Sequence, residues 1–483
     1  MKVLFATSEI APWVKTGGLG DVSGALPQAL HDIGIDVRVL VPGYPALLAA
    51  FGLRTPRARI THPAGGFPSS TLAEAVTASG LRLLIADCPA LYERPGGPYQ
   101  SADGEAWPDN ALRFGLLSKL AALLSSNASP LDWRPDVLHC NDWQSGLAPA
   151  YLYYRLPARV ATVATIHNLS YQGVFPPAVL APLDLPASAL NIDGVEYYGS
   201  VSFLKAALRL SDRITTVSPT YAREIQTPEF GHGLDGLLRS RADRLTGILN
   251  GIDETWNPAA DAFLTARYDL ATIEAKAQNK AALRQRLGLA DDAGAPLLGV
   301  VSRLAHQKGL DLLLRIGDHL AARGAQLALL GSGERWLQEA FAALAERHPG
   351  RFAVTLGYDE SLAHQIEAGA DVFLMPSRFE PCGLNQMYSL RYGTPPVVRA
   401  TGGLADTVTD CSEETLAAGT ANGFVFHAPT PDALLAANDR AIAAWRDPGV
   451  WSRLQAAGMS ADFSWSRAAR QYADLYGSVT GIG

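Results

Sequence analysis

Short apolar runs alternate with longer amphipathic segments along most of the chain, most regularly in its second half. Apolar runs there predict strands at residues 297–301, 326–330, 352–356, 372–375 and 397–398. Between them, apolar positions at helical spacing predict helices at 309–323, 334–348, 361–368 and 384–392. Nearly continuous apolar strands separated by amphipathic helices are typical of parallel sheets covered by helices on both faces.

The first half shows the same alternation less regularly. It opens with an apolar run at 3–7, a glycine-rich segment at 17–20, a helical pattern at about 21–33 and a second strand at 37–41. This order is one βαβ unit. Further strands are predicted at 81–86, 137–139, 161–166 and 214–217.

The pattern therefore predicts an α/β chain of two doubly wound domains. Turn residues interrupt the alternation at 250–253 and again at Asn257 and Pro258, which places the junction there. In such sheets ligands bind at the carboxyl ends of the strands. We expect the strand ends of the two domains to face each other across a deep cleft.

Composition narrows the classes of partner. The chain has 483 residues, enough for two domains, and 48% of them are hydrophobic. Its formal net charge is −7 and it has no run of Lys or Arg, so nucleic acid is not an expected partner. A neutral polymer needs no charge complementarity.

We expect neither a membrane span nor a secretion signal. No segment reaches the roughly 18 to 20 apolar residues that cross a bilayer, and the apolar start is too short for a signal peptide. The cysteines stand far apart and form no CxxC pair, which fits a reducing compartment and predicts a cytoplasmic protein. They are Cys88, Cys140, Cys382 and Cys411.

The glycine-rich segment after the first strand has the features of a diphosphate site. Gly17 and Gly18 allow a ligand to approach the backbone closely, and Lys15 adds a point charge. The segment matches neither the P-loop nor the dinucleotide fingerprint GxGxxG. No acidic residue follows the strand at 37–41, so a nicotinamide dehydrogenase is disfavoured.

A hexapeptide at 16–21, TGGLGD, recurs with one change at 401–406, TGGLAD. We interpret both copies as paired glycines that open a helix, whose free N–H groups can meet an anion or a sugar hydroxyl. The alternative is two ordinary helix starts with Asp in the first turn.

Two further segments follow buried strands of the second half. Arg303 and Lys308 lie at a helix start, where two cations oppose the helix dipole unless an anion binds, although solvated side chains remain the alternative. Glu380 precedes Cys382, Gly383 and Leu384, whose N–H groups could bind a neutral sugar beside the carboxylate. The alternative for Glu380 is a role in the first turn of a helix.

His167 and Asp142 also stand at predicted strand ends, in the first domain, but each suits a structural role equally well. No His or Asp has metal-ligand spacing such as HExxH, and no DxD pair ends a strand. Lys15, Arg303 and Lys308 could replace a metal in stabilising a leaving diphosphate.

Taken together, these segments resemble bacterial glycogen synthases and plant starch synthases almost from end to end. The matching segments are 15–22 (KTGGLGDV), 141–143 (NDW), 167–173 (HNLSYQG), 202–206 (SFLKA), 216–222 (TVSPTYA), 249–253 (LNGID), 302–304 (SRL), 307–309 (QKG), 376–384 (PSRFEPCGL) and 401–407 (TGGLADT).

The resemblance implies the GT-B fold, with residues 1–250 on the glucan side and 251–462 binding the donor. The segment from about 463 to 483 would return to the first domain. The implied reaction moves glucose from ADP-glucose to the non-reducing 4-hydroxyl of glycogen or a maltooligosaccharide. Configuration is retained and ADP is released, with neither a cofactor nor a metal.

The resemblance also implies site residues. The catalytic group would be Glu380, His167, Arg303, Lys308 and Asp142. Substrate would be bound by Lys15, Gly17, Gly18, Asp21, Tyr99, Asn168, Asn250, Tyr358, Cys382, Gly383, Leu384 and Asn385. In these roles the cations hold the diphosphate, Glu380 binds the donor glucose and Tyr358 stacks on adenine. The family usually has Thr where this chain has Asn385.

Two alternatives remain, a near one and a more distant one. One is another retaining GT-B transferase with a different acceptor, such as a sucrose- or trehalose-type enzyme. The other is a non-catalytic sugar- or nucleotide-binding protein with two similar lobes.

Overall fold

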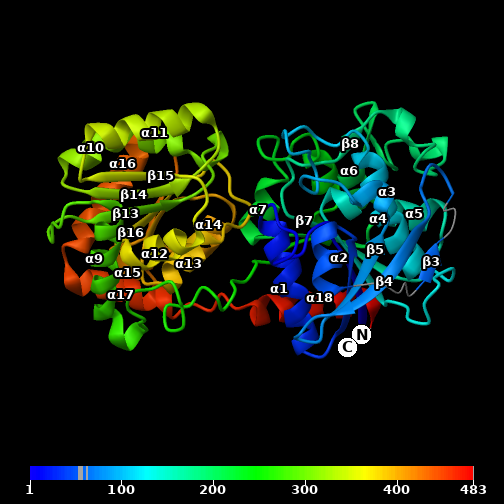
Figure 1. The fold of residues 1–483 in the computed structure, drawn as a ribbon, viewed down its shortest axis with the longest axis horizontal. Coiled ribbons are helices and arrows are strands. Elements are labelled where there is room, and N and C mark those ends of the chain that lie inside the picture. Colours follow the sequence, from blue (N-terminus) through cyan, green and yellow to red (C-terminus); the bar gives the residue numbers. More distant parts are fainter. Residues whose placement is uncertain (53–57, 61–63, 482–483) are drawn as a thin grey trace. The chain divides into compact units, whose positions relative to one another are not determined.

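The computed structural model describes residues 1–52, 58–60 and 64–481. The chain forms two compact units, each described here by itself. Unit 1 comprises Met1–Gly251 and Trp465–Gly483, and unit 2 comprises Ile252–Ser464. The predicted boundaries were 250/251 and 462/463. Both ends of the chain belong to unit 1 (Figure 1).

Unit 1 is built on a sheet in the order β12-β11-β7-β6-β1-β2-β5-β4-β3. The strands are β1 (Lys2–Ala6), β2 (Asp36–Pro42), β3 (Ala58–Ile60), β4 (Ser70–Val76), β5 (Arg82–Asp87), β6 (Val137–Asn141), β7 (Ala161–Ile166), β11 (Arg213–Thr216) and β12 (Leu245–Gly247). The pairs β3–β4 and β4–β5 are antiparallel and the others parallel. Every strand predicted in the first half is present, whereas β3, β4 and β12 were not predicted.

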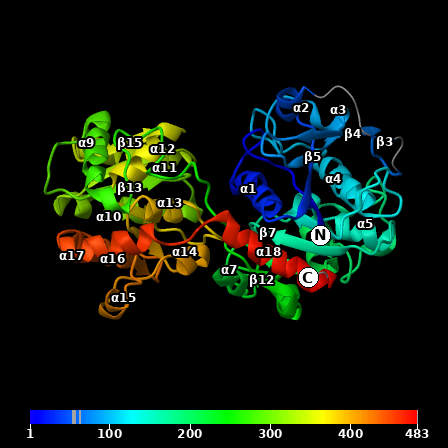
Figure 2. The same cartoon turned by 90° about the horizontal axis from the view of Figure 1, so that it is seen from below.

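Helices cover both faces of this sheet (Figure 1). They are α1 (Gly18–Asp32), α2 (Pro45–Phe51), α3 (Pro89–Tyr92), α4 (Asn110–Ser125), α5 (Ala148–Tyr154), α6 (Phe203–Leu210), α7 (Pro219–Glu224), α8 (Asp235–Ser240) and α18 (Trp465–Thr480). The last helix, α18, packs beside α1 (Figure 2). Its Tyr476 hydroxyl bonds the buried His139 Nδ1 at 2.7 Å, so the C-terminal segment is anchored in the core of unit 1.

A second, small sheet in unit 1 was not predicted. It joins β8 (Val174–Phe175), β10 (Ser200–Ser202) and β9 (Glu196–Tyr197), all antiparallel. Strands of two or three residues are too short to show a period of two, so the sequence pattern carries no signal for them.

Unit 2 contains one fully parallel sheet in the order β15-β14-β13-β16-β17-β18. The strands are β13 (Leu297–Val301), β14 (Gln326–Gly331), β15 (Phe352–Leu356), β16 (Val372–Met375), β17 (Pro396–Arg399) and β18 (Phe424–Phe426). The helices are α9 (Lys276–Leu287), α10 (Leu310–Ala322), α11 (Arg335–Arg347), α12 (Glu360–Gly369), α13 (Asn385–Arg391), α14 (Gly402–Thr407), α15 (Glu413–Ala417), α16 (Pro431–Trp445) and α17 (Pro448–Met459).

Both faces of the unit 2 sheet are buried, as its apolar strands predicted. Leu298 and Val300 of β13 belong to the core beneath α10, α11 and α16, whereas their neighbour Leu297 belongs to the core beneath α9 and α12. Successive side chains of a strand point to opposite faces, so a strand covered on both sides must be apolar throughout.

Within the described part of the chain, no helix combines the length and the apolar character needed to cross a membrane.

Candidate active site

In unit 2, the loops after β13 and β16 bring a cation and a carboxylate into contact. Lys308 Nζ donates to Glu380 Oε2 at 2.5 Å, and Ser377 Oγ donates to the same oxygen at 3.1 Å. Glu380 is buried. The pairing follows from the fold, because β13 and β16 are neighbours and parallel strands end at the same edge of the sheet. The predictions did not foresee this ion pair.

Glu380 is not a first-turn residue of the following helix, because α13 begins only at Asn385. The alternative interpretation of Glu380, as a residue in the first turn of a helix, is therefore wrong. The carboxylate stands in an irregular segment and is held by Lys308 and Ser377.

The two loops are tied together by their backbones as well. Gly309 has φ +64°, and a Cβ there would lie 2.0 Å from the carbonyl oxygen of Pro376, so only glycine fits. Arg378 forms two bonds with the Asp311 carboxylate, at 2.6 and 2.8 Å. This ion pair lowers the pKa of Asp311 and raises that of Arg378. The Lys308–Glu380 pair thus rests on a rigid frame.

The three predicted phosphate-binding cations have different surroundings. Lys308 is paired with Glu380, and Lys15 of unit 1 is paired with Asp21 at 2.7 Å. Arg303 is exposed, with a 3.3 Å contact to Gln307 Oε1. Arg303 and Lys308 share one loop, so one phosphate group could meet both of them.

The segment 382–385 carries backbone donors beside Glu380. Among the described residues, the N–H groups of Gly383 and Leu384 have no protein acceptor. Gln386 Nε2 donates to the carbonyls of Cys382 and Gly383 at 3.1 and 3.2 Å, which fixes this turn. The Asn385 side-chain amide donates one hydrogen bond to Val301 O at 2.7 Å, which ties the start of α13 to the end of β13.

The glycines of the second hexapeptide, 401–406, support the Glu380 segment. Gly403 N donates to the carbonyls of Glu380 and Pro381, each at 3.2 Å. A Cβ on Gly402 would lie 1.9 Å from Glu380 O, and one on Gly403 would lie 2.0 Å from Cys382 O. The expectation that this copy offers free N–H groups to a ligand is wrong for Gly403, because close backbone packing uses its N–H group.

Tyr358 follows β15 and is 83% exposed. Its hydroxyl donates to Glu360 Oε2 at 3.0 Å. Most of the Tyr358 side chain is therefore exposed where β15 ends, at the carboxyl edge of the unit 2 sheet.

In unit 1, His167 and Asp142 meet at the ends of the neighbouring strands β7 and β6. The His167 backbone N–H donates to Asp142 Oδ1 at 2.7 Å, and its Nε2 contacts Asn141 Oδ1 at 3.0 Å. Burial lowers the pKa of His167 to about 3, so its ring is neutral near pH 7. Because Asn141 Oδ1 can only accept, Nε2 carries the proton and donates to it, which leaves Nδ1 as an acceptor. Burial raises the pKa of Asp142 to about 7.

The glycine loop of unit 1 is organised by Glu9, which sequence reasoning missed. The buried Glu9 carboxylate accepts from Thr16 N at 2.6 Å and from Thr16 Oγ1 at 2.7 Å. The Tyr99 hydroxyl also donates to it and contacts Ser8 Oγ at 2.8 Å. The sequence feature that could have identified Glu9 is its position shortly after a buried strand, because an unpaired charge at a buried position is costly.

Gly17 and Gly18 face open space. No described protein atom lies within 4 Å of where a Cβ on either would stand. Gly17 has φ −169°, an extended conformation that any residue adopts. Neither packing nor the φ of Gly17 therefore requires glycine at these two positions.

The two remaining predicted residues of unit 1 are asparagines. Asn168 Oδ1 accepts from Ser170 N and Ser170 Oγ at 3.1 and 2.7 Å and so closes a turn. Asn250 is buried, and its Oδ1 has no hydrogen-bond partner among the described residues. No group of three or more His, Cys, Asp or Glu side chains in the described part of the chain is placed to hold a metal ion.

Comparisons with known proteins agree with this architecture. Residues 2–240 match the family model for the starch synthase catalytic domain, and residues 282–452 match that for glycosyl transferases group 1. The glycogen synthase of Nitrosospira multiformis is 56% identical over 99% of this chain and 97% of its own length. That of Dechloromonas aromatica is also 56% identical, over 99% and 98%.

Two solved structures are similar as well. The catalytic domain of starch synthase IV from Arabidopsis thaliana, bound to ADP and acarbose, superposes with a TM-score of 0.87. It is 32% identical and covers 99% of both chains. A sucrose-phosphate synthase from Thermosynechococcus elongatus has a TM-score of 0.60 at 17% identity, which shows a shared fold only.

Proposed function

Because the chain belongs to the family of glycogen and starch synthases, which are glycosyltransferases of the GT-B fold, we propose that it transfers glucose from ADP-glucose to an α-1,4-glucan. Family membership makes the chain a hexosyltransferase. The proposal adds the donor, the non-reducing 4-hydroxyl as the acceptor group, retention of configuration and release of ADP. The ADP and acarbose bound by the starch synthase IV structure support this choice of ligands.

The observation that carries the proposal is the contact between Lys308 and the buried Glu380. A sugar nucleotide presents an anionic diphosphate and a neutral sugar that are joined by the bond to be broken. In unit 2 a cation and a carboxylate stand next to each other, with the N–H groups of Gly383 and Leu384 close to the carboxylate in sequence. This arrangement supplies a partner for each part of the donor.

On the donor side, Arg303 and Lys308 bind the diphosphate, and Tyr358 stacks on the adenine. The bond between the glucose C1 and the phosphate oxygen breaks, and its electron pair leaves with ADP. The cations stabilise the charge that develops on the phosphate, and the Glu380 carboxylate stabilises the positive charge that develops at C1. Fixed charges in a buried site stabilise a transition state more strongly than they would in water.

On the acceptor side, the 4-hydroxyl oxygen attacks C1 from the face that the phosphate leaves, and its proton passes to the leaving phosphate oxygen. The α configuration is therefore retained. Neutral His167 holds a sugar hydroxyl, and Asp142, Asn168 and Asn250 contribute to the same binding surface. Lys15, with Asp21 beside it, and the open backbone at Gly17 and Gly18 contact the phosphate-bearing end of the donor.

The four cysteines, Cys88, Cys140, Cys382 and Cys411, form no disulfide in the structure. This supports a cytoplasmic location for the enzyme, because disulfides are rare in that compartment.

The deciding experiment measures release of nucleoside diphosphate from ADP-glucose and, separately, from UDP-glucose, each with and without glycogen. We expect release from ADP-glucose that depends on glycogen, and a much slower reaction with UDP-glucose. Release that is independent of glycogen, or release from neither donor, would overturn the proposed reaction.

Two further measurements define the acceptor and the stereochemistry. Acceptors are compared by replacing glycogen with maltooligosaccharides, fructose 6-phosphate or glucose 6-phosphate, and we expect product only with the glucans. Proton NMR of the extended oligosaccharide identifies the anomeric configuration of the new bond. A β-linked product would contradict retention while leaving the donor assignment intact.

A further inference from the structure

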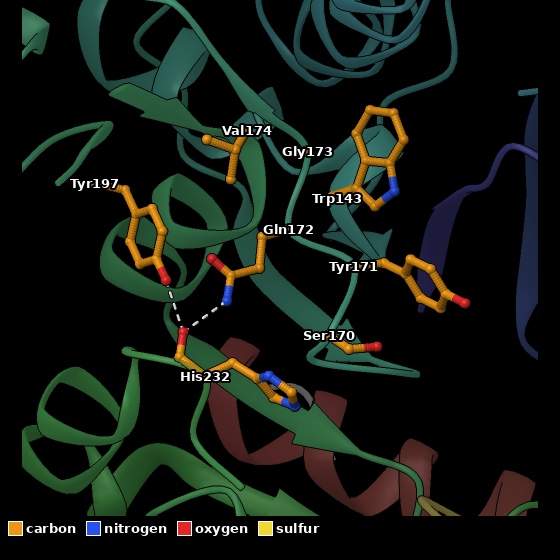
Figure 3. A pocket seen from close by; sticks show the side chains of 8 residues that line it. All are labelled: Trp143, Ser170, Tyr171, Gln172, Gly173, Val174, Tyr197 and His232. Carbon is orange, nitrogen blue, oxygen red and sulfur yellow. Dashed lines mark hydrogen bonds between the residues drawn. The ribbon is translucent and has the colours of Figure 1, made fainter. Parts of the chain in front are cut away.

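The two units are packed differently around the segments that follow their proposed site residues. In unit 1, the residues that come after His167 and Asn168 in the chain border a cavity of about 490 Å³ (Figure 3). In its wall, the His232 carbonyl accepts from the Tyr197 hydroxyl at 2.7 Å and from Gln172 Nε2 at 2.9 Å. The cavity is lined by Trp143, Ser170, Tyr171, Gln172, Gly173, Val174, Tyr197 and His232. In unit 2, the helix that follows the proposed donor residues is instead packed against aromatic rings.

That helix is α13, and its first turn adjoins the proposed donor site. It begins at Asn385, directly after Gly383 and Leu384, whose N–H groups have no protein acceptor among the described residues. Gln386, in the same turn, bonds the carbonyls of Cys382 and Gly383. A helix of seven residues is about 10 Å long, and its internal hydrogen bonds make it move as one piece. A contact that fixes the rest of α13 therefore also fixes these N–H groups.

The connecting segment, residues 252–275, supplies such a contact where it enters unit 2 and leads into α9. The indole of Trp256 lies parallel to the ring of Tyr388 in α13 and to that of His364 in α12, at 8° in each case. The ring centroids are 4.1 Å and 3.7 Å from that of the indole. Two rings this close to one centroid would overlap on the same face, so the indole lies between them. It thereby links α12 to α13, which are neighbours (Figure 1).

Hydrogen bonds fix the rings around this indole. The buried carboxylate of Asp261, in the connecting segment, accepts from His364 Nδ1 at 2.7 Å and from the Tyr392 hydroxyl at 2.6 Å. Burial opposes the charge on Asp261, but the hydrogen bonds prevail and lower the pKa of its carboxyl group. The Tyr268 hydroxyl donates to the Tyr392 carbonyl at 2.7 Å, at the end of α13. The connecting segment is thus attached to both helices.

The connecting segment also makes an exposed contact with α13. Arg391 Nη2 donates to both carboxylate oxygens of Glu254 at 3.0 Å, but the Glu254 side chain is 71% exposed. Exposed ion pairs contribute little because water and salt screen them, whereas packed aromatic rings bury a large apolar area. Trp256, and not Glu254, is therefore the contact that holds α13.

We infer that Trp256 is a positioning residue for the nucleotide-sugar donor. By stacking on Tyr388 it fixes α13, and α13 in turn fixes the N–H groups of Gly383 and Leu384. The inference rests on the proposed function, in which those N–H groups meet the donor, and deepens it by adding a residue that acts through a helix. Because energetic coupling between two sites is reciprocal, a nucleotide bound beside this segment also acts on the Trp256 stack.

The kinetic test compares the wild type with Trp256→Ala, which removes the stack, and Trp256→Phe, which keeps a flat ring. Glu254→Ala is the matched control, because it removes only the exposed ion pair between the same segment and α13. Initial rates of ADP release are measured while ADP-glucose and glycogen are varied separately.

We expect Trp256→Ala to raise the KM for ADP-glucose about five- to tenfold, which corresponds to about 1–1.4 kcal/mol. Trp256→Phe should recover most of this loss, and Glu254→Ala should resemble the wild type. The KM for glycogen should stay unchanged in every variant. Loss of folded protein would lower the apparent kcat and leave both KM values alone, so this split separates positioning from a merely structural role.

An optical test follows the same coupling without catalysis. The chain has nine tryptophans, so the emission of Trp256 is obtained as the difference between the wild type and Trp256→Phe. Titration with ADP should change the emission of the wild type more than that of Trp256→Phe, because nucleotide bound beside α13 alters the ring contacts of the indole.

Two results would overturn the inference while the proposed function stands. One is a wild-type KM for ADP-glucose in Trp256→Ala, and the other is an equal response to ADP in the wild type and Trp256→Phe. If Trp256→Ala does not fold, the emission comparison decides alone. If the wild type releases no ADP with any glucan, the proposed function itself fails, and an ADP response that requires Trp256 would still link this residue to a nucleotide site.

Discussion

Residues 16–21 and 401–406 have nearly the same sequence, yet the structure uses them in opposite ways. In the first copy, Gly17 and Gly18 face open space and the segment opens the 15-residue helix α1. In the second, Gly402 and Gly403 are packed against the backbone of Glu380 and Cys382, and the helix α14 has six residues. A glycine pair can therefore admit a ligand or admit another stretch of backbone.

The threonines that precede the glycines show the same contrast. Thr16 is exposed and its backbone and hydroxyl bind the Glu9 carboxylate. Thr401 is fully buried. The first copy is thus a surface loop that is hydrogen-bonded to the Glu9 carboxylate. The second copy is buried and packs against the backbone of the loop that carries Glu380.

The largest expected effect concerns what the second copy supports. If its purpose is to place Glu380, then Glu380→Ala should lower kcat by about 10²- to 10³-fold, the usual cost of losing one transition-state partner. Stopped assays of ADP release measure this. Glu339→Ala, which removes an exposed glutamate of α11, is the control and should have wild-type kinetics. Near-normal rates for Glu380→Ala would refute the proposed role.

The next effect tests the packed glycines. Gly403→Ala should destabilise the protein by about 1–3 kcal/mol, because the new Cβ meets Cys382 O and the backbone must shift. Urea unfolding followed by circular dichroism measures the change. Because the same shift moves the Glu380 segment, kcat should fall as well. An unchanged unfolding midpoint would show that the close packing is not needed.

The same substitution in the first copy should give the opposite result. Gly17→Ala should leave the free energy of unfolding within about 0.5 kcal/mol of the wild type, because no described protein atom meets the new methyl group. If a ligand approaches there, the KM for ADP-glucose should rise about tenfold, which corresponds to about 1.4 kcal/mol. Gly236→Ala, at another exposed glycine of unit 1, is the control. Unchanged donor kinetics would remove Gly17 from the site.

The smallest effect concerns the hydrogen bonds to the Glu9 carboxylate, which holds Thr16 of the first copy. Tyr99→Phe removes one of the hydroxyl groups bound to Glu9, a loss of about 0.5–1.5 kcal/mol. The KM for ADP-glucose should rise a few-fold, while kcat with saturating donor should stay near normal, since the change acts on the Lys15 loop and not on Glu380. A fall in kcat alone would show that Tyr99 acts in the chemical step instead.

Much of the candidate site could be predicted because of how parallel sheets are built. Arg303, Glu380, His167 and Asp142 were all placed just beyond predicted strands, and the strands β13, β16, β7 and β6 are where they were expected. Parallel strands that follow one another through helices all end at one edge, so residues after them gather there. Glu9 and Ser377 were missed because their contacts join segments that no local pattern connects.

By itself, the sequence determined the α/β alternation, the two sheets' main strands and the residues available at the strand ends. Those features depend on the spacing of apolar side chains over a few residues, which the sequence displays directly. Only the tertiary structure decided that Lys308 pairs with Glu380 and that Trp143, Tyr197 and His232 surround one cavity. It also decided that one TGGL segment faces open space while the other is buried. These outcomes depend on which distant segments become neighbours, and identical local sequences carry no record of what is packed against them.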